Sequence, residues 1–119
     1  MHGLKPFIVL DIGQHLKHVT ARFRLGISDI MVHRLRYKVG TYNELLCPLC
    51  KQEEENEVHF VLRCVVLRDV RESFLKPKYY RQPSLFKLNL LMSSSVAEVV
   101  RNFALYLYRA FKFRELALS

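Results

Sequence analysis

Cysteine is scarce in this sequence, with three residues among 119. An odd count argues against a framework of disulfide bonds, and in a reducing compartment these thiols would stay free. The sequence also lacks internal repeats and low-complexity tracts. Half of the residues are hydrophobic and a quarter are charged, a balance that is typical of a globular fold. A chain of this length is therefore expected to form one domain.

Long apolar runs are also missing. The run Phe7–Leu10 near the amino end has four residues and follows Lys5 and Pro6, which does not fit a signal peptide. The longest uncharged apolar stretch near the carboxyl end, Phe103–Tyr108, is far shorter than the ~20 residues that span a bilayer. We therefore expect an intracellular protein, nuclear or cytoplasmic, without a membrane partner.

Aspartate is also scarce. Asp11, Asp29 and Asp69 are the only three, and none is adjacent to another. Polymerisation with two magnesium ions needs clustered carboxylates, so this chemistry is not expected here. We predict no catalytic residues and no enzymatic activity for the chain by itself.

Positive charge, by contrast, is abundant. Lysine and arginine number 19 against 11 aspartates and glutamates, which gives a formal net charge of +8. Such a surplus favours polyanionic partners, of which nucleic acid is one.

Apolar residues recur at helical spacing in several segments. We predict a mainly α domain of four or five helices, with at most a short β-hairpin near Cys47. Residues 1–13 form a poorly defined segment with a β-like run, Phe7–Leu10, closed by Gly13. Residues 14–119 form a single zinc-binding helical domain. Its helices are predicted over residues 14–25, 28–36, 65–75, 84–92 and about 96–116.

Several residues predict the helix boundaries. Gly26 should end the first helix, and Ser28 should cap the second. Pro77 should stop the third, and Lys76 to Pro83 should form a basic, aromatic linker. Ser95 and Glu98 match a capping box for the last helix. The apolar stripe of that helix comprises Val96, Val100, Phe103, Leu107, Ala110 and Phe111.

The strongest motif is C-x2-C-x8-H-x4-C, formed by Cys47, Cys50, His59 and Cys64. Zinc prefers four thiolate and imidazole ligands in a tetrahedron, and two residues between cysteines allow both sulfurs to face one ion. All three cysteines lie in this 18-residue window. The motif predicts a structural zinc ion. A degenerate or thiol-only site is the alternative, because a lone C-x-x-C occurs by chance.

The spacing between His59 and Cys64 raises a geometric difficulty. Residues five apart on an ideal α-helix are separated by ~140°, so the two cannot share one face in the middle of a helix. We therefore expect the helix to begin near His59 or to be distorted there. Lys51 and Arg63, beside the ligands, could offset the negative charge of three thiolates or could simply be solvated.

The order of these motifs resembles the carboxyl-terminal zinc-binding region of reverse transcriptases from non-LTR (LINE-type) retrotransposons. The resemblance covers about Arg22 to Arg114 and includes, besides the Cys/His motif, Arg22–Gly26, His33–Tyr37, Pro83–Leu88 and Ala104–Phe111. The Cys/His spacing is its most specific part, and it differs from the retroviral nucleocapsid knuckle, which has four residues before the histidine.

The resemblance implies zinc ligation by Cys47, Cys50, His59 and Cys64, and it implies no catalytic residue. In that family the region follows the polymerase and is thought to help bind template RNA or target DNA. This sequence lacks the paired aspartates of the polymerase, so it looks like a detached tail of a larger protein.

Three functions remain open at this point. The first is a zinc-stabilised nucleic-acid-binding module, in which tyrosines 37, 79 and 80 could stack on bases. The second is a protein-interaction or scaffold domain that uses apolar residues of the last helix outside its main stripe: Leu105, Tyr106, Tyr108 and Phe113. The third is a retroelement remnant without a selected activity. For the first, the candidate nucleic-acid-binding residues are Arg34, Arg36, Lys38, Lys76, Lys78 and Arg81.

Overall fold

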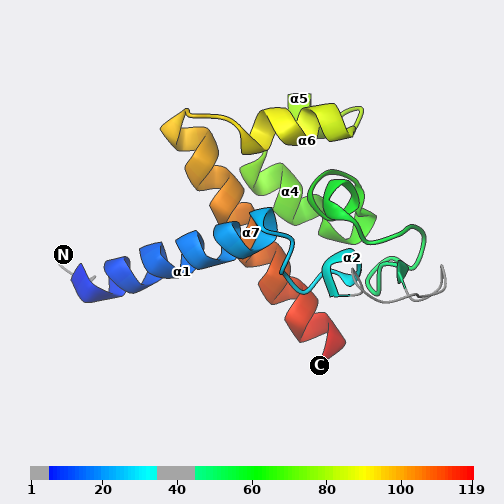
Figure 1. The fold of residues 1–119 in the computed structure, drawn as a ribbon, viewed down its shortest axis with the longest axis horizontal. Helices are drawn as coiled ribbons and strands as arrows, with labels where there is room; N and C mark the ends of the chain where they lie inside the picture. Colours follow the sequence, from blue (N-terminus) through cyan, green and yellow to red (C-terminus); the bar gives the residue numbers. More distant parts are fainter. Residues whose placement is uncertain (1–5, 35–44) are drawn as a thin grey trace.

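The computed structural model describes the backbone over residues 6–34 and 45–119, and the side chains over residues 13–33 and 45–119. Its helices are α1 (Pro6–Arg24), α2 (Met31–Arg34), α4 (Arg68–Phe74), α5 (Pro77–Tyr80), α6 (Leu85–Met92) and α7 (Ala97–Leu118) (Figure 1). A π-helical turn, η1 (His59–Arg63), and a 3-10 turn, η2 (Val65–Leu67), precede α4. Within the described ranges, β-pairing is limited to one antiparallel bridge, Leu46 with Glu54. The predicted mainly α fold is confirmed.

Helix α7 is the element around which the others pack. Helices α1, α4 and α6 all contact it, and α1 crosses it at a steep angle (Figure 1). The rings of Phe23, Phe60, Phe103 and Phe111 meet where these elements converge, with the closest centroids, those of Phe60 and Phe111, 4.6 Å apart. The core thus joins the first and last helices to the segment that carries the Cys/His motif.

Helix α1 is longer than the sequence predicted. The β-like interpretation of Phe7–Leu10 is wrong, because these residues belong to α1, which also continues through Gly13. Proline at the first helical position is compatible with a helix. A single internal glycine costs only about 1 kcal/mol relative to alanine, which does not end a long helix.

Gly26 ends α1 as predicted. Its φ of 72° lies in the left-handed region that favours glycine. The amides of Gly26 and Ile27 donate to the carbonyls of Phe23 and Arg22, which is the Schellman pattern of a helix C-terminus.

In the predicted helix over residues 65–75, Val66, Val70 and Phe74 recur at four-residue spacing. Val70 and Phe74 are half-buried against the core, but Val66 is exposed, and the fully buried positions lie one residue further on, at Leu67, Arg71 and Leu75. The 3-10 turn η2 winds more tightly than an α-helix and so changes the phase of the residues that follow. The predicted linker after Pro77 contains the one-turn helix α5.

The start of α6 agrees with the predicted helix over residues 84–92, whereas the start of α7 does not agree with the predicted capping box. Ser84 caps α6, since its hydroxyl accepts from the amide of Lys87. The capping box of Ser95 and Glu98 is wrong, because the N-cap of α7 is Val96 and no side chain caps it. Helix α7 therefore begins one residue later than the Ser95-x-x-Glu98 spacing requires.

Candidate metal centre

The first two cysteines lie in a tight turn. The amide of Lys51 donates to the carbonyl of Cys47 at 2.8 Å, and Lys51 has a φ of 58°. The amides of Cys47 and Glu55 bond to the carbonyls of Glu53 and Leu45, each at 2.8 Å. These bonds hold the two flanks of the loop together and turn Cys47 and Cys50 towards the residues that follow.

The π-helical turn η1 resolves the difficulty of the His59–Cys64 spacing. The amide of Cys64 donates to the carbonyl of His59 at 2.8 Å, five residues back. A turn closed by an i→i+5 bond is wider than an α-helical turn, so residues five apart come back to the same side. The amide of His59 is fixed by the side-chain oxygen of Asn56 at 2.8 Å. The predicted distortion is therefore present, and it lies between the two ligands.

The four predicted ligand atoms converge. The sulfurs of Cys47 and Cys64 are 3.9 Å apart, the sulfur of Cys50 is 3.4 Å from Nε2 of His59, and all four atoms lie within 4.8 Å of one another. Around one tetrahedral zinc ion, two sulfurs would be ~3.8 Å apart and a sulfur and a nitrogen ~3.6 Å apart. The cluster thus has the size and donor set to hold a metal ion.

Burial and the orientation of His59 also fit a metal. Cys47, His59 and Cys64 are buried and Cys50 is half-buried. Nδ1 of His59 is buried without a hydrogen-bond partner and faces Oε1 of Glu53 at 3.7 Å. A metal on Nε2 would place the ring proton on Nδ1, pointing at this carboxylate, which is the usual arrangement of a metal-binding histidine.

Glu53 is held in this position by Arg63. The Arg63 Nε donates to Oε1 of Glu53 at 2.8 Å, and this contact keeps the pKa of the Glu53 carboxyl below its usual 4.5. Glu53 is therefore charged at neutral pH. The sequence predicted that Arg63 offsets the thiolates or is merely solvated; in the structure it pairs with Glu53.

The thiols of Cys47 and Cys64 interact with each other at the centre of the cluster. The hydrogen bond with Cys64 lowers the pKa of Cys47, and the same hydrogen bond, together with burial, raises the pKa of Cys64. A cation would have to displace the proton of the Cys64 thiol, as metal binding to cysteine pairs does.

Two side chains from outside the turn stabilise η1. A wide turn leaves backbone carbonyls without helical partners, and buried carbonyls need donors. The buried guanidinium of Arg71 donates to the carbonyls of Val61 and Cys64, each at 2.8 Å. The hydroxyl of Tyr106 donates to the carbonyl of Phe60 at 2.5 Å. Both donors lie on helices, α4 and α7, so the ligand turn is tied to the core.

Glu55, in the loop of the Cys/His motif, is also buried and contacts two helices. Its carboxylate is fully buried and accepts two bonds from Arg114 of α7 and one from the amide of Met31 at the start of α2. Burial alone would lower the pKa of Arg114, but the Glu55 carboxylate raises it. The loop between the two halves of the Cys/His motif thus anchors α2 and α7.

The region around Ser28 also differs from the prediction. Ser28 does not cap α2, which begins at Met31. Its hydroxyl and its amide instead lie 2.6 and 3.2 Å from Nδ1 of the buried His33. Because the amide can only donate, Nδ1 accepts, and Nε2 carries the proton towards Glu57 at 3.0 Å. The segment after α1 is thereby attached to the segment that precedes His59.

The predicted nucleic-acid-binding residues are placed only in part. Arg36, Lys38 and the side chain of Arg34 lie outside the described residues, and so does Tyr37. Lys76, Lys78 and Arg81 are exposed around α5, with the ammonium of Lys78 5.2 Å from the Tyr79 ring centroid. Tyr79 itself is buried, so the prediction that it stacks on bases is wrong; Tyr80 is only half-buried.

Comparisons with protein-family models, with curated proteins and with solved structures found no match. Among the described residues, no helix combines the length and the apolar character that crossing a membrane requires.

Proposed function

We propose that Cys47, Cys50, His59 and Cys64 hold one Zn²⁺ ion with a structural role. The observation that carries this proposal is the convergence of three sulfurs and one imidazole nitrogen within 4.8 Å. Thiolate and imidazole ligands bind zinc in preference to harder divalent ions such as magnesium and calcium, which favour oxygen ligands. Four protein ligands would leave no position for an activated water, so we propose no catalysis at this centre.

We propose further that the zinc-stabilised domain binds nucleic acid, either RNA or DNA. The net charge of +8 supports an anionic partner. The cations Lys76, Lys78 and Arg81 are exposed on the segment that follows the ligand turn and α4. The resemblance to the carboxyl-terminal region of LINE-type reverse transcriptases supports the same function. On this proposal the chain serves in binding and lacks the polymerase part.

The test is a titration of the zinc-loaded chain with labelled single-stranded RNA and DNA at about 50 and 200 mM salt. Binding through several phosphates should weaken steeply between these two salt concentrations. The same titration after removal of zinc with a chelator should show no binding, because the metal holds the fold together. Absence of binding to either nucleic acid at the lower salt would overturn the proposal.

A second candidate is a protein-interaction domain, which the carboxyl end of α7 supports. Phe113, Leu116 and Leu118 are 42, 71 and 46% exposed, although Tyr106, which we had also placed outside the apolar stripe, is fully buried in the core. Apolar side chains exposed together can mark a contact surface. Self-association that depends on concentration, without affinity for nucleic acid, would favour this candidate over the first.

A further inference from the structure

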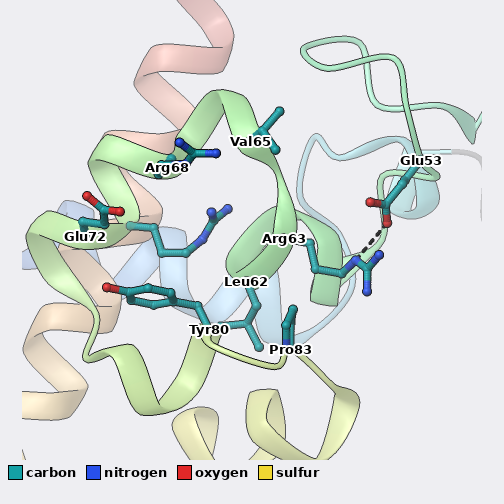
Figure 2. Close-up of a pocket in the computed structure, with 9 residues that line it drawn as sticks. Glu53, Leu62, Arg63, Val65, Arg68, Glu72, Tyr80 and Pro83 are labelled. Atoms are coloured by element: carbon teal, nitrogen blue, oxygen red, sulfur yellow. Dashed lines mark hydrogen bonds and ion pairs between the residues drawn. The ribbon is translucent and has the colours of Figure 1, made fainter.

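A pocket of about 440 Å³ lies beside the π-helical turn η1. Arg68 and Glu72 of α4 line one side, and Arg63 and Glu53 line the opposite side (Figure 2). The remaining lining residues are Leu62, Val65, Arg71, Tyr80 and Pro83. The volume lies within the range of about 300–1,000 Å³ that is typical of pockets for small ligands.

Three guanidinium groups and two carboxylates line this pocket, and their roles differ. Arg71 is fixed by the carbonyls of Val61 and Cys64, so its charge is held in place below the surface. Arg63 is paired with Glu53. Arg68 is exposed and has no ion pair within the described part of the chain. The formal balance is therefore positive, and the side chain of Arg68 can turn towards an anion.

Tyr80 and Pro83 add uncharged, largely apolar side chains to the lining of the pocket. Tyr80 lines the pocket and is half-buried. Aromatic side chains of nucleic-acid-binding proteins stack on unpaired bases. Glu72 adds a hydrogen-bond acceptor on α4 for a base amine or a ribose hydroxyl. Cation, aromatic ring and acceptor are the groups that together bind a nucleotide.

We infer that this pocket holds one nucleotide of a single-stranded nucleic acid. The phosphate binds between Arg63 and Arg68, and the base stacks against Tyr80 and Pro83. This inference rests on the proposed nucleic-acid-binding function and assigns a place to it that does not include Arg34, Arg36 or Lys38.

The pocket is mechanically linked to the metal centre. Arg71, in the pocket wall, donates to the carbonyl of Cys64, which is one of the proposed metal ligands. Arg63 and Glu53, on the opposite wall, connect to His59 through the 3.7 Å contact of Glu53. Removal of the metal would release both walls, so binding in the pocket depends on a loaded centre.

The test measures binding of a labelled single-stranded oligouridylate to the zinc-loaded full chain by fluorescence anisotropy. Arg68→Ala is compared with Arg109→Ala, which removes an exposed arginine of α7 that does not line the pocket. We expect Arg68→Ala to weaken binding about tenfold. It should also reduce the salt slope by about 0.7, because the variant neutralises one phosphate fewer. Arg109→Ala should change the affinity less than twofold (a factor of about 2 is within the usual surface effect).

Tyr80 supplies the matched test of stacking. Tyr80→Ala should weaken binding about 5- to 100-fold, whereas Tyr80→Phe, which keeps the ring, should bind like the unchanged chain. Zinc content and helical circular dichroism of each variant show that it has folded.

Each outcome decides one point. If the unchanged chain binds and Arg68→Ala and Tyr80→Ala bind equally well, the pocket assignment is overturned while the proposed function stands. If the unchanged chain binds neither the oligouridylate nor a single-stranded DNA of the same length at about 50 mM salt, both fail. Weaker binding by both Arg68→Ala and Tyr80→Ala, with unchanged binding by the controls Arg109→Ala and Tyr80→Phe, supports the pocket.

Discussion

Arg114, near the end of α7, forms two hydrogen bonds with the carboxylate of Glu55, which lies 59 positions earlier in the loop of the Cys/His motif. The two bonds measure 2.8 and 2.7 Å, and both side chains are buried. This pair connects the loop of the Cys/His motif to α7. The Cys/His cluster and the helical core are therefore expected to unfold together.

The Glu55–Arg114 pair leads to the first prediction. Arg114→Met leaves the Glu55 carboxylate buried without its cation, and removing one partner of a buried pair costs about 3–5 kcal/mol. We expect a decrease of this size in the free energy of unfolding, measured by urea denaturation of the zinc-loaded chain. Arg109→Met is the control on the exposed face of the same helix. A decrease in Arg114→Met no larger than in this control would contradict the role given to the pair.

The second prediction concerns the carbonyls that η1 leaves free. Tyr106→Phe removes the donor to the carbonyl of Phe60 while keeping the ring in the core. An unsatisfied buried carbonyl costs about 1–3 kcal/mol. Denaturant unfolding should show a decrease in stability of this size. The half-buried Tyr108, treated in the same way, should show little change, and equal effects in the two variants would count against the hydrogen bond as the cause.

The third prediction concerns alkaline pH. Burial raises the pKa of Tyr106 above the value of 10.0 that it has in the unfolded chain. The folded state therefore keeps a proton that the unfolded state releases. Above pH 10.0 the unfolded chain gains free energy by releasing this proton, whereas the folded chain does not. The stability that this group contributes is therefore lost as the pH rises above 10.0. The free energy of unfolding should fall with increasing pH, with a slope that approaches about 1.4 kcal/mol per pH unit. This component should be missing from Tyr106→Phe when unfolding is followed between about pH 9 and 11; identical slopes in the two proteins would rule it out.

The fourth prediction concerns the basic segment before the motif. Replacing Arg34 and Arg36 together by alanine should weaken RNA binding and lower the salt slope by up to about 0.7 for each phosphate that is no longer neutralised. Zinc content and stability should not change, because the ligands and the core are untouched. A double variant with unchanged affinity and salt slope would leave the pocket and the segment around α5 as the contact surface.

The sequence was informative where one residue type determines the local structure. The four candidate ligands were found because thiolate and imidazole at fixed spacing have few other uses. Gly26 was found because a left-handed φ at the end of a helix favours glycine. These features depend on neighbours in the sequence, so no knowledge of the fold was needed.

The residues that were missed depend on contacts between distant segments. Arg71 and Arg114 looked like surface cations, and Glu55 looked like part of a solvated loop, since charged residues are mostly exposed. Only the packing of α4 and α7 against the motif turns them into buried partners. A signal for Arg71 existed: it lies four residues after Leu67 and four before Leu75, on the face that is buried.

The helix boundaries failed where two local preferences competed. Phe7–Leu10 has strand-forming residues, yet the run belongs to the helix that begins at Pro6. Ser95 and Glu98 have the spacing of a capping box, yet α7 begins after Val96. In both cases local propensity was a weak guide to where the helix begins.

The metal content of the purified chain, measured by elemental analysis, decides whether Cys47, Cys50, His59 and Cys64 form a zinc centre. We predict one zinc ion per chain, and none in Cys64→Ser, in which a ligand sulfur is replaced by a poor zinc ligand. The serine variant should also lose its helical circular dichroism, because metal binding and folding are coupled. A fully helical chain that contains no zinc and takes up none when zinc is supplied would contradict the proposed centre.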